Sequence, residues 1–159
     1  MRISLKGGSL REELKQRMLK HLNFLEVEMR DYSKFKKLTW TDYTTDVDKR
    51  RSVERWTENI INSSIDISKN ILTLEGISLP DNYKEIVLLT SIVKGLSFDK
   101  AELLSQWVKF RNIISHEYLD IRWASIKRFI SETEPLYKDF LDKTKAYLEK
   151  KIAEDKKTQ

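Results

Sequence analysis

The chain has 159 residues, of which 35% are charged, and its net charge of +5 favours polyanionic partners such as nucleic acids. With only 4 glycines and 2 prolines, the composition excludes a turn-rich β fold and favours long solvated helices. The lack of cysteine excludes disulfides and thiolate metal sites, two distant histidines offer little to zinc, and no apolar run of about 18 residues could span a membrane.

We expect three segments of unequal length along the chain. Residues 1–9 should form a flexible lead-in, and this segment lacks the apolar stretch of a signal peptide, which favours a cytoplasmic location. Residues 10–152 should form a single helical bundle domain. Residues 153–159 should form a frayed basic tail, whose lysines could simply belong to a solvated helix end.

The first two predicted helices are long. Ser9 and Glu12 form a capping-box pattern, so the first helix should run from about Leu10 to Lys37. The second helix should run from about Val47 to Glu75 and end at Gly76. A seven-residue apolar repeat in the second helix is typical of a long helix packed nearly antiparallel on others (Val53, Ile60, Ile67, Leu74).

The segment between these helices, residues 39–46, is rich in threonine and aspartate, which favour caps and turns. Trp40 and Tyr43 in this segment could stack on a base, although we prefer the interpretation that they seal the end of the bundle. A basic cluster follows near the start of the second helix (Lys49, Arg50, Arg51). This cluster could contact RNA phosphates, or it could be solvated without a partner.

Two shorter helices should follow. A turn at 79–82 leads into a third helix over about Tyr83 to Lys94, which Gly95 ends. Ser97 or Asp99 should cap a fourth helix. Its apolar stripe should then lead directly into a cluster of polar side chains (Leu103, Trp107, Phe110, Ile114).

A fifth helix should begin at about Arg122, after a short break at 120–121. Glu134 and Pro135 lie in a second capping-box pattern, so this helix should kink or restart there. Together these patterns predict an all-α, up-and-down bundle of about five helices.

The polar cluster at the end of the fourth helix concentrates groups that are typical of functional sites. Arg111, Ser115 and Tyr118 share one helix face, and Asn112 and His116 share another. Arg111 and His116 lie roughly 140° apart on a straight helix. The two side chains converge only if the helix ends or bends near Ser115, or if a second copy of the chain completes the site.

These residue types suit cleavage of RNA without a metal. His116 could move the proton of the 2′-hydroxyl or of the leaving oxygen, and Arg111 could stabilise charge on the phosphate. The spacing alone also fits a structural interpretation. In that case His116 is a cation at a helix end and Arg111 pairs with a surface glutamate.

The stretch Arg-Asn-x-x-x-His-x-Tyr, residues 111–118, resembles the signature of HEPN-domain ribonucleases, and its final tyrosine resembles the HepT toxin branch. Residues 53–67 resemble the second helix of that family, and Leu79-Pro80-x-x-Tyr83 resembles its Leu-Pro-x-x-Tyr connection. The similarity covers roughly residues 10–150. Asn62 departs from it, because a glutamate is expected before the pair of small residues.

The resemblance implies a HEPN-like bundle that pairs as a homodimer, with the motifs of both chains lining one cleft. The two His116 side chains would act as base and acid, and the two Arg111 side chains would hold the phosphate. Asn112 would orient the phosphate or His116, or else cap a helix. The implied product is a 2′,3′-cyclic phosphate, with no metal or cofactor required. Basic side chains would hold the RNA (Lys49, Arg50, Arg51, Lys109).

The resemblance also implies a toxin–antitoxin system. In HepT-like toxins, an antitoxin of the MntA nucleotidyltransferase type adds AMP to the tyrosine that corresponds to Tyr118. The added charge and bulk would keep RNA out of the cleft. An alternative is a non-catalytic HEPN-like module that binds nucleotides or a partner, and a second is a plain helical interaction protein.

Overall fold

The computed structural model describes the backbone of residues 2–157 and the side chains of residues 10–157. The described chain is almost entirely helical, and it contains no β-strand, so the predicted all-α fold is confirmed. None of these helices is both long enough and apolar enough to cross a membrane.

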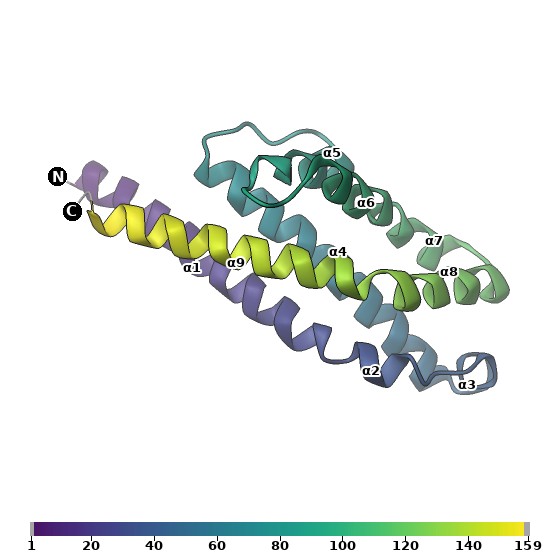
Figure 1. The fold of residues 1–159 in the computed structure, drawn as a ribbon. Helices are drawn as coiled ribbons and strands as arrows, with labels where there is room; N and C mark the ends of the chain where they lie inside the picture. Colours follow the sequence, from purple (N-terminus) through teal and green to yellow (C-terminus); the bar gives the residue numbers. More distant parts are fainter. Residues whose placement is uncertain (1, 158–159) are drawn as a thin grey trace.

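Three long helices form the frame of the bundle, and they lie along one another in Figure 1. They are α1 (Arg2–Met29), α4 (Val47–Leu74) and α9 (Glu134–Lys157). The start of α1 and the end of α9 lie together at one end of the bundle (Figure 1), where Arg11 Nε donates to Asp155 at 2.8 Å.

Short helices complete the two ends of this frame. At the end opposite the termini, α2 (Tyr32–Phe35) and α3 (Trp40–Thr45) connect α1 to α4 (Figure 1). A second group packs along the other side of α4 and returns the chain to α9. This group consists of α5 (Tyr83–Leu88), the 3₁₀ helix η1 (Leu89–Ile92), α6 (Phe98–Val108), α7 (Phe110–His116) and α8 (Leu119–Glu132).

Local capping explains where several helices begin and end, as predicted. Asp46 accepts hydrogen bonds from the N–H groups of Asp48 and Lys49 at the start of α4. Gly76 follows α4 with a φ of 71°, a left-handed conformation that suits glycine. Ser97 caps α6 by accepting from the N–H of Lys100.

The first predicted helix differs from the structure at both ends. The backbone is helical from Arg2, so Ser9 lies within α1 and does not cap a helix that begins at Leu10. Further along α1, Arg11 and Lys15 pair with Asp155 near the end of α9, and a local capping pattern does not show such contacts. The helix ends at Met29 instead of Lys37. The predicted irregular segment contains α3. This helix begins with a reciprocal capping box between Thr39 and Asp42.

The apolar stripe predicted for the fourth helix is partly wrong. Leu103 is 48% exposed, whereas Leu104 and Val108 are buried. A turn at Lys109 divides the predicted helix into α6 and α7. The buried positions of α6 are therefore not spaced from those of α7 as they would be on one continuous helix. The break before α8 comes at 117–118, earlier than predicted, and the predicted restart at Glu134 is confirmed.

An aromatic cluster centred on Phe129 fills the middle of the bundle. The centre of its ring lies 5.5–6.3 Å from the ring centres of its neighbours, distances at which aromatic pairs are favourable. These neighbours come from five helices (Tyr32, Trp56, Trp107, Phe110, Tyr137). The cluster therefore ties α7, which carries the polar motif, to the core.

Candidate functional site

Two buried side chains anchor helix α7 to the bundle. Phe110 stacks on Phe129 with 5.9 Å between ring centroids, and Ile114 is buried one turn later. This spacing leaves the other faces of α7 open. Asn112 and Ser115 are exposed there, and Arg111 is half-buried.

Helix α7 ends at His116, which meets one of the two conditions for the convergence of Arg111 and His116, an end or bend near Ser115. Glu117 and Tyr118 are extended, with ψ angles of 160° and 158°, and the N–H of Glu117 donates to the carbonyl of Ile113. His116 is exposed in the last turn of α7, and Tyr118 occupies the position before α8. The side chain of Tyr118 is 82% exposed, which leaves its hydroxyl open to solvent.

Arg111 belongs to a cluster that sequence reasoning did not find. Its guanidinium carbon lies 5.2 Å from the ring centre of Tyr83, the first residue of α5. Lys69 of α4 places its ammonium 4.7 Å from the centre of the same ring. The Tyr83 ring thus attracts both cations by cation–π interactions. The Leu-Pro-x-x-Tyr segment pointed to Tyr83, but nothing in the sequence pointed to Lys69.

Neither cation of this cluster is neutralised by a carboxylate. Among the described residues, Arg111 and Lys69 make no ion pair, although charged groups make up about a third of the chain. Two positive charges beside one ring repel each other, and a bound anion relieves that repulsion. The Arg111–Tyr83–Lys69 cluster is therefore suited to holding a phosphate group.

The neighbouring Arg122 has the opposite environment. Its guanidinium donates to the carboxylate of Glu54, with Nε at 3.0 Å from Oε2, and the hydroxyl of Tyr43 donates to the same carboxylate. Burial and the nearby Glu54 carboxylate both raise the pKa of Tyr43. The contacts between Tyr43, Glu54 and Arg122 join α3, α4 and α8. They hold the first turn of α8 in place, directly after Tyr118.

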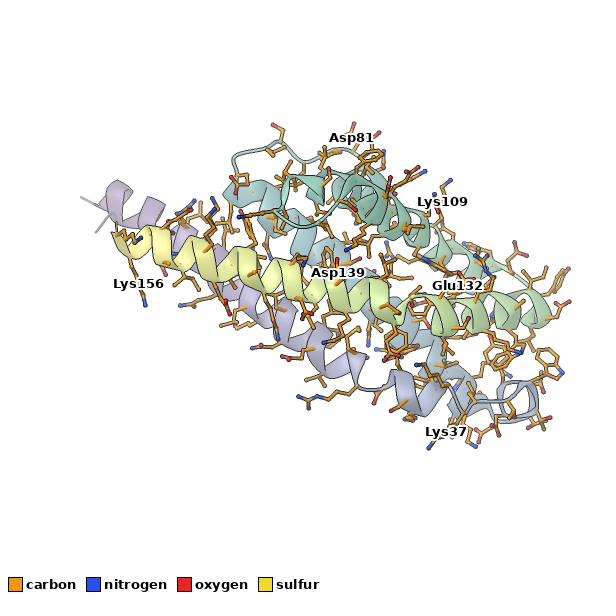
Figure 2. All side chains as sticks on the ribbon, viewed as in Figure 1. Lys37, Asp81, Lys109, Glu132, Asp139 and Lys156 are labelled. Atoms are coloured by element: carbon orange, nitrogen blue, oxygen red, sulfur yellow. The ribbon has the colours of Figure 1, made fainter. Side chains whose placement is uncertain are left out.

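The four basic residues predicted to bind RNA differ in their surroundings. Arg50 donates to the carbonyls of Tyr43 and Thr44, at 3.1 and 3.3 Å, and Lys49 pairs with Asp42 at 3.3 Å. Both side chains therefore have structural partners near α3. Arg51 is exposed, and so is Lys109, whose side chain extends from the surface between α6 and α7 in Figure 2.

An open groove lies beside the motif, between α6, α7 and α8. Its cavity volume is about 340 Å³. Trp107 forms part of its wall, and the guanidinium of Arg128 lies 5.5 Å from the centre of the Trp107 ring. The lining combines aromatic, aliphatic and polar side chains (Leu103, Gln106, Trp107, Lys109, Phe110, Ile113, Ser125, Arg128, Glu132). Arg128 pairs with Glu132 at 3.3 Å, whereas Lys109 makes no ion pair among the described residues. Such a lining can accept a nucleobase while Lys109 approaches the phosphates.

No metal centre is evident in the part of the chain that the structure describes, because no group of three or more histidine, aspartate or glutamate side chains is placed to hold an ion. No curated protein matches the sequence. The sequence model of one family, described as ribonuclease HepT-like, matches residues 25–144, which include α4, the Tyr83 connection and the whole α7 motif. The chain therefore belongs to the HepT-like ribonuclease family.

Proposed function

We propose that the chain is the toxin of a toxin–antitoxin system and cleaves RNA internally, without a metal, through Arg111 and His116. Membership of a ribonuclease family supports RNA as the substrate. The observation that carries the proposal is the end of α7. An arginine that makes no ion pair among the described residues and an exposed histidine lie within one short helix, next to an aromatic groove whose lining includes Lys109.

In the proposed reaction, the 2′-hydroxyl oxygen attacks the adjacent phosphorus and the bond to the 5′-oxygen breaks. One histidine accepts the hydroxyl proton, and a second histidine donates a proton to the leaving oxygen, which yields a 2′,3′-cyclic phosphate and a 5′-hydroxyl. Arg111 stabilises the charge that develops on the phosphate oxygens. Asn112, exposed one position later, orients the phosphate or His116.

Two histidines require two copies of the chain, since His116 is the histidine of this motif and His21 lies on α1, near Asp66 of α4. A homodimer with α7 at its interface supplies both. Exposed apolar side chains on α5 and α6 support such pairing, among them Tyr83 at 44%, Phe98 at 58% and Leu103 at 48% exposure. Light scattering coupled to size exclusion tests the dimer directly.

The test of the nuclease proposal is cleavage of single-stranded RNA in EDTA by the purified chain, beside His116→Ala. We expect cleavage by the wild type, termini that carry a cyclic phosphate, and loss of activity in the variant. His21→Ala is the matched control, because it removes the other histidine and leaves α7 intact. Equal cleavage by wild type and His116→Ala would assign the activity elsewhere.

The intact mass of each sample is measured in parallel, because a modified tyrosine would also silence the enzyme. If the wild type carries no added mass and does not cleave RNA, the nuclease proposal fails. The non-catalytic binding module then becomes the better explanation of the fold.

Tyr118 is the proposed site at which a partner nucleotidyltransferase adds AMP. Its 82% exposure and its extended position between two helices support access by a second enzyme. Incubation with such an antitoxin and ATP should add about 329 Da per AMP to the wild type (a value set by AMP itself) and nothing to Tyr118→Phe, whose fold retains the ring. Addition of the same mass to Tyr118→Phe would place the modification on another residue.

A further inference from the structure

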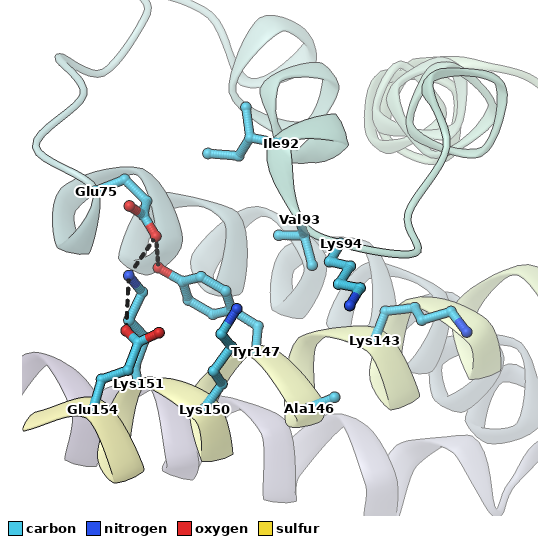
Figure 3. Close-up of a pocket in the computed structure, with 10 residues that line it drawn as sticks. All are labelled: Glu75, Ile92, Val93, Lys94, Lys143, Ala146, Tyr147, Lys150, Lys151 and Glu154. Atoms are coloured by element: carbon cyan, nitrogen blue, oxygen red, sulfur yellow. Dashed lines mark hydrogen bonds and ion pairs between the residues drawn. The ribbon is translucent and has the colours of Figure 1, made fainter. Parts of the chain in front are cut away.

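A second pocket lies between the last turn of α4, η1 and the second half of α9 (Figure 3). It is toward the end of the bundle where the termini meet, away from the α7–α8 junction (Figure 1). Its cavity volume is about 260 Å³, near the lower limit of about 300 Å³ for typical small-molecule sites. Nothing in the proposed nuclease mechanism uses this pocket.

One wall of the pocket is an aromatic ring that hydrogen bonding holds in place. The hydroxyl of Tyr147 donates to Oε1 of Glu75 at 2.7 Å, and Lys151 donates to the same oxygen at 3.0 Å (Figure 3). These bonds lower the pKa of Glu75, which therefore stays ionised and engaged. Glu154, the other carboxylate of the lining, lies 3.7 Å from Lys151. Lys151 thus balances one of the two carboxylates, and the lysines of the lining outnumber its carboxylates (Lys94, Lys143, Lys150, Lys151).

The remaining polar groups of the lining are three lysines. Lys94 and Lys150 make no ion pair among the described residues, and Lys143 lies 3.9 Å from Asp139, at the limit of an ion pair. In Figure 3 the ammonium of Lys94 lies between η1 and α9, whereas the ammonium of Lys143 extends away from Tyr147. Like charges gathered without counter-charges favour an anionic ligand.

Backbone geometry brings Lys143 close to the segment that carries Lys94. Gly95 has a φ of 88°, and a Cβ added to it would lie 2.9 Å from Cδ of Lys143. Only glycine therefore allows the stem of Lys143 to pack against this turn. The cationic side of the pocket is built by this close approach between η1 and α9.

Apolar atoms line the space between the cations and the ring. Ile92 is 50% exposed on η1, and Val93 and Ala146 complete this surface. A simple inorganic anion would leave the ring and the apolar surface in contact with water. A ligand with a planar ring and a phosphate group satisfies both sides of the pocket.

We propose that this pocket binds a nucleotide, with its base against Tyr147 and Ile92 and its phosphates at the mouth, near Lys94 and Lys150. The nucleotide is either free or the end of an RNA strand. The site is independent of the α7 motif, so binding here and cleavage there can be tested separately.

The experiment is titration calorimetry of the full chain with ADP, pyrophosphate and adenosine. ADP should bind more tightly than either of the others, since it alone engages both sides of the pocket. Lys94→Glu and Lys150→Glu should each weaken ADP binding roughly tenfold. Lys127→Glu on the exposed face of α8 makes the same change in net charge and should have little effect. Arg111→Ala, which alters the α7 site, should leave ADP binding unchanged.

Tyr147→Ala tests the contribution of the aromatic ring to binding apart from the contribution of the lysines. It should weaken ADP roughly tenfold and leave pyrophosphate unchanged, whereas Tyr147→Phe, which keeps the ring, should bind ADP like the wild type. A 5′-phosphorylated 2′-O-methyl trinucleotide, which lacks the hydroxyl needed for cleavage, distinguishes an RNA end from a free nucleotide by whether it binds more tightly than ADP.

Three results would overturn the proposal. The first is an absence of ADP binding to the wild type. The second is equal weakening by Lys127→Glu and the pocket variants, which would reduce the effect to general charge attraction. The third is ADP binding that Arg111→Ala abolishes, which would place the nucleotide at the α7 motif. RNA cleavage by the pocket variants is measured beside each titration. At saturating RNA, kcat should equal that of the wild type, and a raised KM for RNA would identify an RNA end as the ligand.

Discussion

Arg111 and Arg122 are eleven positions apart, on consecutive helices, and their surroundings differ in one respect. Arg122 is held by the carboxylate of Glu54, and the Tyr43 hydroxyl donates to the same group. Arg111 meets an aromatic ring and a second cation, with no carboxylate partner among the described residues. The first arrangement balances the charge of the arginine within the fold, and the second leaves it for a ligand.

This difference shows how structural and functional cations can be separated in a chain that is rich in both. A paired cation stabilises the helices that it joins and offers little to a substrate. A cation that the fold positions but does not neutralise is placed for a negatively charged partner. The same criterion selects Lys94 and Lys150 of the second pocket, which make no ion pair among the described residues. The following predictions test it from the largest expected effect to the smallest.

Replacing Arg111 should affect catalysis and leave the fold nearly unchanged. We expect Arg111→Ala to lower the turnover of RNA about 100-fold or more, because a positioned donor to the phosphate is lost. Its unfolding free energy should fall by no more than about 1 kcal/mol, the value of a partly exposed cation–π contact. Arg111→Lys should recover only part of the activity, since an ammonium lacks the forked geometry. Cleavage assays and urea unfolding measure the two effects.

Replacing Glu54 should have the reverse effect. Glu54→Gln leaves the Arg122 charge partly buried without its partner, and we expect a loss of about 2 kcal/mol in unfolding free energy. This is below the range for fully buried pairs because the two side chains retain 14% and 21% exposure. Cleavage per folded molecule should change little. Glu102→Gln, at an exposed position of α6, is the matched control. A stability loss in the control as large as that in Glu54→Gln would break the contrast between the two arginines.

The Tyr83 ring should contribute to RNA binding indirectly, by holding Arg111 and Lys69 in position. Tyr83→Leu should raise the KM for RNA about three- to fivefold with a smaller change in kcat, because two phosphate contacts lose their common support. Tyr83→Phe keeps the ring and should behave like the wild type. If Tyr83→Phe were as impaired as Tyr83→Leu, the hydroxyl would be the important group and the cation–π explanation would be wrong.

The paired charges near the termini predict a response to acid. Hydrogen bonds from Arg11 and Lys15 lower the pKa of Asp155 from 3.8 to about 2. Since the folded-state pKa is the lower one, the stabilisation is complete above about pH 4 and is lost as the pH falls toward 2. The Tm of Asp155→Asn should therefore lie below that of the wild type at pH 5, and the difference should narrow steadily as the pH falls toward 2. A constant difference across this range would exclude ionisation as the cause.

Helix ends set by neighbouring residues could be predicted from the sequence. The start of α4 at Val47, the glycine after it and the restart at Glu134 all depend on side chains within a few positions. The end of α7 at His116 was not predicted, because the break was placed at 120–121. The start of α1 at Arg2 was not predicted either, because the capping-box pattern at Ser9 indicated a start at Leu10.

The chemistry of the site was only partly visible in the sequence. The motif on α7 identified Arg111 and His116 as candidates, and a family match then supported a ribonuclease. The environment of Arg111 depends on Lys69, 42 positions earlier in the sequence, and on Tyr83, and no local pattern brings these side chains together. The contact between Glu54 and Arg122 spans 68 positions, and it could not be distinguished from a chance pair of charges in the sequence.

The ion pair between Arg11 and Asp155 joins positions 144 residues apart, and this separation has a consequence for folding kinetics. Each doubling of a loop adds only about 0.6 kcal/mol to the entropic cost of closing it, so the long connection is tolerable at equilibrium. Contacts of such separation nevertheless form slowly, whereas α5 and α6 are neighbours in sequence. We therefore expect α4 to α8 to assemble first during refolding, with α1 and α9 docking together in the slowest step.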